Sequence, residues 1–145
     1  MNQPMKADGR LRLRAEDAEA LGFISAALQD AVLKVGDIQY APGARTLTLA
    51  LNRYRWEKGG ERIRTGLQFG AVLKCQSRNI RRDAPDAVVS LLSIEFSHTR
   101  EDDPGGCITL HFAGDGDLKI EVECVDAALA DLSDPWPTPR TPAHG

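Results

Sequence analysis

The side chains of this chain that are best able to act as nucleophiles are three cysteines, Cys75, Cys107 and Cys124. They are widely spaced, and no two of them form a Cys-x-x-Cys pair. Cys75 and Cys124 fall on the apolar phase of their predicted strands, where a cysteine usually behaves as a small, inert hydrophobic residue. No Gly-x-Ser-x-Gly elbow occurs. The sequence therefore predicts no catalytic residue, and three free thiols in a reducing compartment.

Histidines and carboxylates are the other groups that could do chemistry, as ligands of a metal ion. His98, His111 and His144 lack the spacing of a paired metal site. Acidic clusters at 101–103 and 115–117 could suit calcium, but they lie at opposite ends of one predicted strand, roughly 20 Å apart at ~3.3 Å per residue. One ion cannot contact both clusters, so we predict no metal ion and no cofactor.

The clearest binding chemistry lies in residues 52–66, whose sequence is NRYRWEKGGERIRTG. A two-residue turn at Gly59-Gly60 predicts a hairpin with Arg55 opposite Arg64, apolar side chains on one face and arginines on the other. The planar donor fork of arginine suits carboxylates and phosphates. The sequence therefore gives four candidate contacts for a protein or an anionic partner: Arg53, Arg55, Arg62 and Arg64.

Opposed arginines repel each other by up to ~1 kcal/mol, so this hairpin needs negative charge from elsewhere. Glu121 and Glu123 could supply it inside the fold, and a carboxylate or phosphate of a partner could supply it from outside. Arg12 and Arg14 could extend the same face. A face that is merely solvated is the third alternative, and the sequence leaves all three open.

A second candidate contact is Trp136, which lies in a tail that contains four prolines, DPWPTPRTP. Such a segment could adopt a polyproline II conformation and bind an aromatic groove on another protein. It could equally fold back and dock Trp136 on its own domain. We expect a single domain over residues 1–133 and a proline-rich tail over 134–145.

Length and composition are those of an ordinary soluble globular protein. The chain has 145 residues, of which 42% are hydrophobic and 27% are charged. No apolar run approaches the ~20 residues of a membrane span, and the first ten residues lack the apolar core of a secretory signal. We therefore expect a cytoplasmic protein.

Charge is distributed unevenly along the chain, although the net charge is only −3. Residues 52–82 contain nine Lys or Arg and two Asp or Glu, whereas residues 83–145 contain three and thirteen. The two segments could neutralise each other within the fold. Nucleic-acid-binding modules are usually basic overall, which argues against a nucleic-acid partner.

Element signals begin with a strand at 10–14 and a helix that starts near Glu16 and runs to Lys34 before Gly36. Most of the remaining chain shows strand patterns. A bulge near Asn52 would explain why the apolar phase of residues 46–57 changes. In the hairpin of residues 107–124, a three-residue loop at 114–116 would pair Phe112 with Leu118, Leu110 with Ile120 and Ile108 with Val122, leaving Cys107 opposite Glu123.

Residues 126–132, DAALADL, predict a short closing helix capped by Asp126. The expected fold class is α+β, with one long N-terminal helix packed on a curved, mostly antiparallel sheet of about seven strands. Strands followed by a closing helix is also the order found in pleckstrin-homology-like barrels. That similarity concerns architecture and does not give a function.

Four segments, LNRYRWE, SLLSIEF, KIEVECVDAALADL and DPWPTP, resemble the domain of unknown function 2948 family, small single-domain alphaproteobacterial proteins. The resemblance covers nearly the whole chain and implies one domain and a cytoplasmic bacterial origin. It contains no catalytic signature and carries over no functional residue. We therefore interpret the chain as a small non-enzymatic binding or adaptor module of unknown oligomeric state. An enzyme with a site built from loops and a self-associating structural protein are the alternatives.

Overall fold

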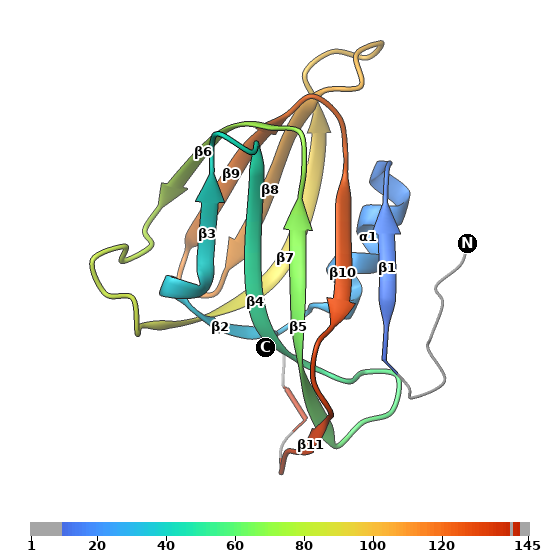
Figure 1. Ribbon diagram of the computed structural model, residues 1–145, viewed down its shortest axis with the longest axis vertical. Helices are drawn as coiled ribbons and strands as arrows, with labels where there is room; N and C mark the ends of the chain where they lie inside the picture. Colours follow the sequence, from blue (N-terminus) through green and yellow to red (C-terminus); the bar gives the residue numbers. More distant parts are fainter. Residues whose placement is uncertain (1–9, 140, 143–145) are drawn as a thin grey trace.

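The structure is a computed structural model that describes residues 10–139, 141 and 142. These residues form one α-helix, α1 (Ala18–Ala27), and eleven strands of an antiparallel sheet that bends into two layers (Figure 1). The front layer contains β3 (Ile38–Ala41), β4 (Thr46–Tyr54), β5 (Glu61–Phe69), β10 (Ala127–Asp131) and β1 (Arg12–Ala15), with β11 (Trp136–Pro137) added to β5. The layer behind contains β7 (Val88–His98), β8 (Gly106–Phe112), β9 (Gly116–Val122) and β6 (Val72–Arg78).

The core lies between the two layers and follows from strict alternation along the strands. In the front layer Leu49 pairs with Leu67, and both side chains are fully buried. In the back layer Ile108 pairs with Ile120. Each buried aliphatic side chain of this size contributes roughly 1.5–3 kcal/mol. β2 (Val32–Lys34) joins the layers because it pairs with both β4 and β7, and a 3₁₀ turn (Val35–Asp37) follows it.

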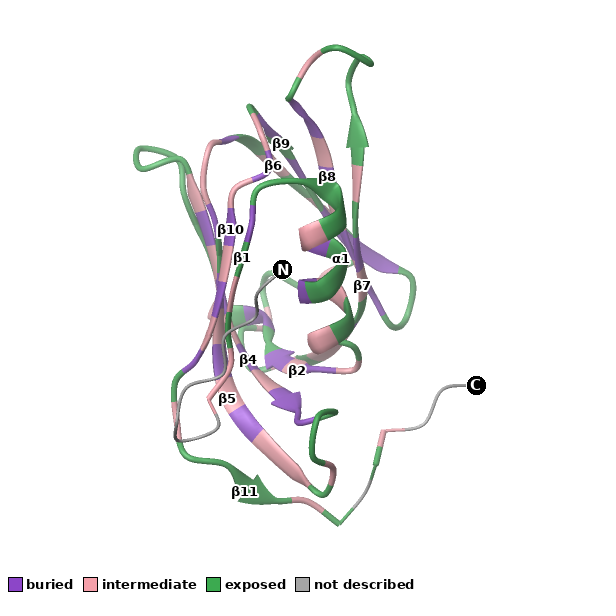
Figure 2. Cartoon of the chain, turned by 90° about the vertical axis from the view of Figure 1, so that its right-hand side faces the viewer, coloured by how far each residue is buried: buried purple, intermediate pink, exposed green. Residues whose placement is uncertain are grey.

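Helix α1 closes the side of the molecule between β1 and β7 (Figure 2). Asp17 caps its N-terminus by accepting a hydrogen bond from the Ala20 N–H at 2.8 Å. Leu21 and Ile24 point into the core. Farther along β7, where β2 no longer pairs with it, the hydroxyl of Ser25 in α1 accepts a hydrogen bond from the Ile94 N–H at 2.9 Å. The helix therefore also covers part of an open edge of β7.

The expected long N-terminal helix is wrong. The helix ends at Ala27, and Asp30 has a left-handed φ of 63°. Ala31, Leu33 and Val35 are then all buried at a spacing of two, which is the periodicity of a strand. A short apolar run fits the periodicity of a helix as well as that of a strand. Here backbone pairing with β7 favours the strand.

The expected closing helix at residues 126–132 is also wrong. This segment forms β10, which lies between β1 and β5 and buries Ala127, Leu129 and Asp131 on one face. Alanine favours helix, but a central position in a sheet decides the conformation. The fold is therefore mostly an antiparallel sheet of eleven strands with one ten-residue helix in the described part of the chain, and not the expected α+β fold with about seven strands. The predicted likeness to pleckstrin-homology-like barrels included a closing helix, and residues 126–132 do not form one.

Two predictions of strand register need correction. β4 pairs regularly with β5 from Leu47 to Tyr54, without a bulge near Asn52. Tyr54 is buried without a bulge, and its hydroxyl accepts a hydrogen bond from the Gly60 N–H at 2.8 Å and contacts the Thr141 hydroxyl at 3.1 Å.

In the β8–β9 hairpin the three loop residues are 113–115, so Ile108 faces Ile120 and Cys107 faces Glu121. The predicted pairs are displaced by two residues. A shift of two keeps every side chain on its predicted face. All three cysteines are free, as predicted.

Candidate functional site

The arginine-rich hairpin has a longer loop than its Gly59-Gly60 pair suggested. β4 ends at Tyr54 and β5 begins at Glu61, so six residues form the loop. Both glycines have positive φ, 85° and 76°, inside this loop. The predicted register differs from the observed one by three residues. Because side chains alternate between the two faces of a sheet, an odd shift places the side chains of one strand on the opposite face relative to those of its partner. Arg64 therefore pairs with Asn52 and not with Arg55.

This register separates the four candidate arginines. Arg53 continues the inward phase of β4 and is fully buried, and Arg55 in the loop is nearly so. Arg62 and Arg64 lie on the outer face of β5 and are half-buried. The four side chains therefore form two groups with different environments.

Arg53 is bound by two carboxylates inside the fold. Its Nε and Nη2 donate to the two oxygens of Asp131 at 2.8 and 2.7 Å. Its Nη1 and Nη2 donate to the two oxygens of Glu57 at 3.0 and 2.9 Å. Asp131 also accepts hydrogen bonds from the Leu11 N–H and the Thr65 hydroxyl, both at 2.7 Å. This cluster thus links β4, β5 and β10 with the residue that directly precedes β1.

Electrostatics in the cluster favour the charged forms. Burial alone would raise the pKa of Asp131, but the hydrogen bonds from Arg53, Thr65 and Leu11 outweigh it and lower that pKa. The pKa of Glu57 is lowered in the same way against the effect of burial, chiefly by Arg53. Burial opposes charge on Arg53 too, yet its two carboxylates raise its pKa further.

The cluster continues outward with alternating charge. Arg55 lies 3.6 Å from Glu57 and donates to Glu61, and Lys58 lies 3.4 Å from Glu61. Three acidic and three basic side chains therefore neutralise one another from β10 to the hairpin loop. Arg53 and Arg55 serve the fold, and the Glu121 and Glu123 suggested from sequence are not their partners.

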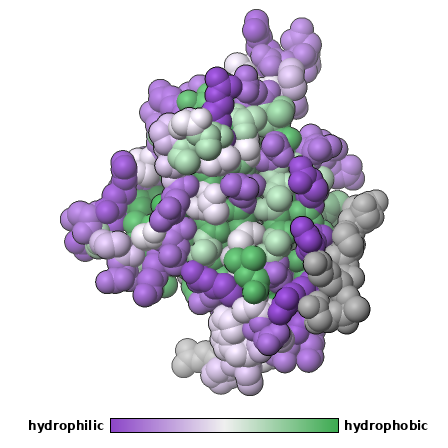
Figure 3. All heavy atoms as spheres, in the orientation of Figure 1, coloured by the Kyte–Doolittle hydropathy of each residue, from purple (hydrophilic) through white to green (hydrophobic). Residues whose placement is uncertain are grey.

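The outer face of the front layer carries the other basic residues. Arg12 and Arg14 of β1 lie on this face beside Ala130 and Ala128, and Arg62 and Arg64 lie on it from β5. Small side chains fill the centre, where Ala50, Gly66 and Ala130 are aligned across three strands. Figure 3 shows this face, with pale and green atoms in the middle and purple, hydrophilic atoms around them. We define the basic outer face as eight residues: Arg12, Arg14, Arg62, Arg64, Ala50, Gly66, Ala128 and Ala130.

Counter-ions neutralise only part of this face. Arg14 lies 3.5 Å from Asp126, and Arg64 lies 3.1 Å from Asp37. Arg62 donates to the Asn52 carbonyl at 3.1 Å, and its guanidinium lies 6.0 Å from the centre of the Tyr54 ring. Arg12 and Arg62 have no carboxylate partner among the residues that the structure describes. These two side chains remain able to bind an anion.

Trp136 lies beside this face. It pairs with Arg62 in the short β11–β5 ladder, and Pro137 pairs with Glu61. The residue is 38% exposed. The backbone of the tail thus rests on the domain, while Trp136 remains partly accessible.

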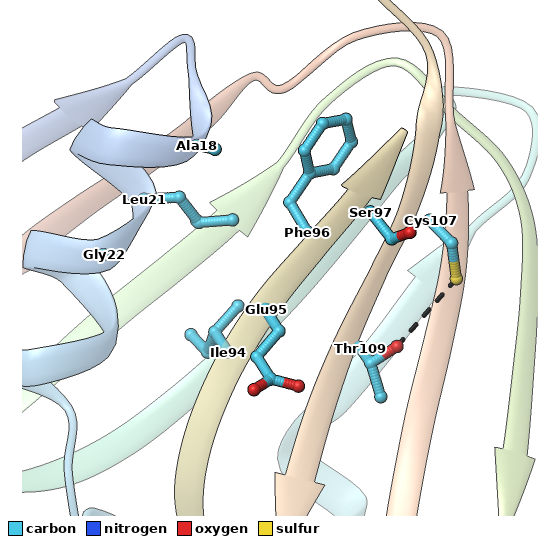
Figure 4. A pocket seen from close by; sticks show the side chains of 9 residues that line it. All are labelled: Ala18, Leu21, Gly22, Ile94, Glu95, Phe96, Ser97, Cys107 and Thr109. Atoms are coloured by element: carbon cyan, nitrogen blue, oxygen red, sulfur yellow. Dashed lines mark hydrogen bonds between the residues drawn. The ribbon is translucent and has the colours of Figure 1, made fainter. Parts of the chain in front are cut away.

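A second candidate site is a shallow groove of about 420 Å³ between α1 and the β7–β8 pair (Figure 4). Leu21, Ile94 and Phe96 supply its apolar wall, and Glu95 and Cys107 are among its polar groups. The Cys107 sulfur contacts the Ile108 carbonyl and, at 3.9 Å, the Thr109 hydroxyl. His111 contacts Glu95 at 2.8 Å. Neither contact of Cys107 is to a base, so this geometry does not activate the thiol.

The remaining chemical signals are weak in the described part of the chain. Burial raises the pKa of the Cys75 thiol, which keeps it protonated and unreactive, although Arg82 acts in the opposite direction. No three His, Cys, Asp or Glu side chains among these residues are grouped as metal ligands. The one helix described, ten residues long, is not one that could span a membrane.

Comparison with known families identifies the family of this chain but gives it no function. Residues 11–144 match the family described as protein of unknown function (DUF2948). The chain belongs to the DUF2948 family. The resemblance carried by the four sequence segments is thereby confirmed. No curated protein and no solved structure matches this DUF2948 chain.

Sequence reasoning missed the acidic residues that organise the site of this DUF2948 chain. The sequence patterns place Asp131 in a helix, give Asp37 no arginine partner, and set Glu57 opposite Arg62 instead of beside Arg53. A signal for Asp131 did exist, because Ala127, Leu129 and Asp131 alternate as on the buried face of a strand. A carboxylate on a buried phase predicts a cationic partner.

Proposed function

We propose that this chain is a non-enzymatic binding module that recognises an acidic segment of another protein through the basic outer face. The observation that carries the proposal is the pair Arg12 and Arg62, which lie on one face without carboxylate partners in the described residues. With strands ~4.8 Å apart and ~3.3 Å per residue, their Cα atoms are roughly 16 Å apart. An extended segment of about five residues spans that distance.

The flat centre of the face supports a protein partner. Small residues keep the centre of this face flat, and the exposed side chain of Leu132, which lies over Gly66, adds an apolar contact. Arginine is enriched at protein interfaces and binds carboxylates through two parallel hydrogen bonds. The net charge of −3 argues against a nucleic acid.

The test is the double variant Arg12→Glu/Arg62→Glu, used as bait in an extract of the native cell with identification of the captured proteins. We expect the unfolding free energy to fall by less than about 2 kcal/mol, because Arg12 is exposed and the half-buried Arg62 loses only one hydrogen bond to a carbonyl and a contact with the Tyr54 ring. Capture of acidic partners should disappear. Capture by the unchanged chain should weaken as salt rises, since exposed charges are screened within ~10 Å at 0.1 M.

A matched control is Arg81→Glu/Arg82→Glu, which makes the same charge change in the exposed loop between β6 and β7. This control should capture the same proteins as the unchanged chain. Equal capture by both double variants, or equal loss in both, would exclude a specific role for the basic outer face.

A further inference from the structure

The lower part of β5 is paired with a segment that is not a continuation of β10. β10 pairs with β5 as far as Asp131 opposite Thr65, and the Leu132 N–H then donates to the Arg64 carbonyl at 2.7 Å. Residues 133–135 leave the ladder. The chain returns as β11, with Trp136 opposite Arg62, which is a register shifted by two residues from that of β10. We call residues 133–139 the strap.

The strap is bound to β5 largely through groups that any extended peptide could offer. Besides the two-residue ladder of β11, the Thr138 N–H donates to the Gly60 carbonyl at 2.9 Å. The Ser133 hydroxyl accepts a hydrogen bond from the Arg64 N–H at 3.0 Å. Residues 134–137 are all exposed. Removal of the strap would leave the Gly60–Arg64 edge of β5 without a strand beside it.

Two side chains of the strap indicate which peptides would fit this edge. Asp134, whose side chain is 93% exposed, forms an ion pair with Arg10 at 3.0 Å. Trp136 lies next to Arg62 in the ladder. An extended segment with a carboxylate two residues before an aromatic residue, followed by proline, would reproduce these contacts. Additional acidic residues would meet the basic outer face, because Arg62 belongs to both surfaces.

We propose that the Gly60–Arg64 edge of β5 is a strand-addition site for an acidic, aromatic-containing extended segment of a partner protein, and that the strap occupies this site in the free chain. The strap is therefore an internal competitor that the partner displaces. This proposal rests on the proposed function, since it names the form in which the acidic partner binds. Sheet edges bind peptides in this way through main-chain hydrogen bonds, with side-chain contacts supplying specificity.

The test uses a labelled synthetic peptide of residues 132–139 as the probe and fluorescence anisotropy as the readout. The peptide is titrated into the full chain and into a chain truncated after Leu132. We expect binding to the truncated chain that is at least ten-fold tighter than binding to the full chain, where the strap occupies the edge. Peptides carrying Trp136→Ala or Asp134→Lys should bind the truncated chain more weakly.

A second variant serves if truncation prevents folding, which circular dichroism would show. In the full chain, Trp136→Ala/Thr138→Pro removes the indole and the N–H that donates to Gly60 but keeps all other residues. It should bind the peptide more tightly than the unchanged chain does. The proposal would be overturned if the truncated chain or the double variant folded but bound the peptide no better than the full chain does. It would also be overturned if the only binding found were the association of two full chains into a dimer.

The two proposals fail in distinguishable ways. If Arg12→Glu/Arg62→Glu leaves protein capture unchanged while the peptide binds the truncated chain, the strand site stands and the basic outer face is rejected. If capture is lost in that variant but the peptide binds neither chain, the face stands and the strand site is rejected.

Discussion

Arg53 shows how one side chain can satisfy a wholly buried charge. The guanidinium has five N–H groups, and its acceptors are the four oxygens of Asp131 and Glu57 together with the Tyr54 carbonyl at 3.3 Å. A lysine in its place could not contact both carboxylates in this planar manner. Because burying ions costs about as much as their attraction returns, we expect the cluster to specify the arrangement of the strands more than to add net stability.

Removing one member of this cluster should therefore be severe. Arg53→Met leaves Asp131 buried without its charge partner, and we expect the free energy of unfolding to fall by about 3–5 kcal/mol. Urea denaturation would measure the change. Arg64→Met is the matched control on the neighbouring strand, where the half-exposed pair with Asp37 contributes below about 1 kcal/mol. Similar losses in both variants would contradict the structure of the cluster.

Acid gives the same cluster a second signature. Because the folded protein lowers the pKa of Asp131 and Glu57, their contribution to stability is complete above their unfolded values, about 4. It is lost as the pH falls from there through the folded values. Unfolding free energy measured between pH 6 and pH 2 should decrease more steeply for the unchanged chain than for Asp131→Asn. Parallel curves would show that Asp131 does not titrate with a lowered pKa.

Part of this cluster was readable from the sequence. Leu47, Leu49, Leu51 and Arg53 share one phase of a strand, so simple alternation places Arg53 inside. Two aromatic residues on the opposite phase favour a bulge instead, and burying Arg53 is costly without a charge partner. Only its partner Asp131, 78 residues away, removes that cost, and a distant partner of this kind has no local sequence signal.

At the scale of elements, two glycines with opposite surroundings test how the helix and the sheet are packed. Gly22 lies within α1, and a Cβ placed there would meet no heavy atom within 4 Å. Gly22→Ala should stabilise the protein by about 0.5–1 kcal/mol, through helix propensity and a less flexible unfolded chain. Gly106→Ala in β8 should destabilise it by about 1–3 kcal/mol, because its Cβ would collide with the Ser97 carbonyl oxygen and lie 2.8 Å from the Phe96 ring. Thermal unfolding would measure both, and a reversed order would contradict the packing of α1 and β8.

The elements that the sequence predicts well are those with long alternating patterns, such as β4, β5, β8 and β9. Errors occur where two physical rules compete. Residues 31–35 fit both helix and strand, and residues 126–132 combine helix-forming alanines with strand alternation. The length of the loop sets the strand register in each hairpin. In the β8–β9 hairpin the predicted register is wrong by two residues, which leaves every side chain on its predicted face. In the β4–β5 hairpin it is wrong by three residues, which divides the arginines between two environments.

At the scale of the whole molecule, stability should be distributed unequally. The middle of the back layer, β8, has a paired strand on each side, and its inward side chains are fully buried. The strap pairs on one side only, through an exposed two-residue ladder. Segments with few buried contacts open locally, without unfolding of the rest. The proposed displacement of the strap by a partner requires such local opening.

Amide hydrogen exchange can measure this difference directly. We expect the Thr138 N–H, which bonds to Gly60, to exchange with a protection factor below about 100, because one or two surface hydrogen bonds add little net free energy. The amides of Ile108 and Leu110 should exchange only through global unfolding, at a free energy of about 5–15 kcal/mol. Adding urea should then accelerate exchange in β8 and leave that of Thr138 nearly unchanged, since local opening exposes little surface. If Thr138 exchanges as slowly as Leu110, the strap is an integral part of the folded domain, and a partner could not displace it without unfolding the sheet.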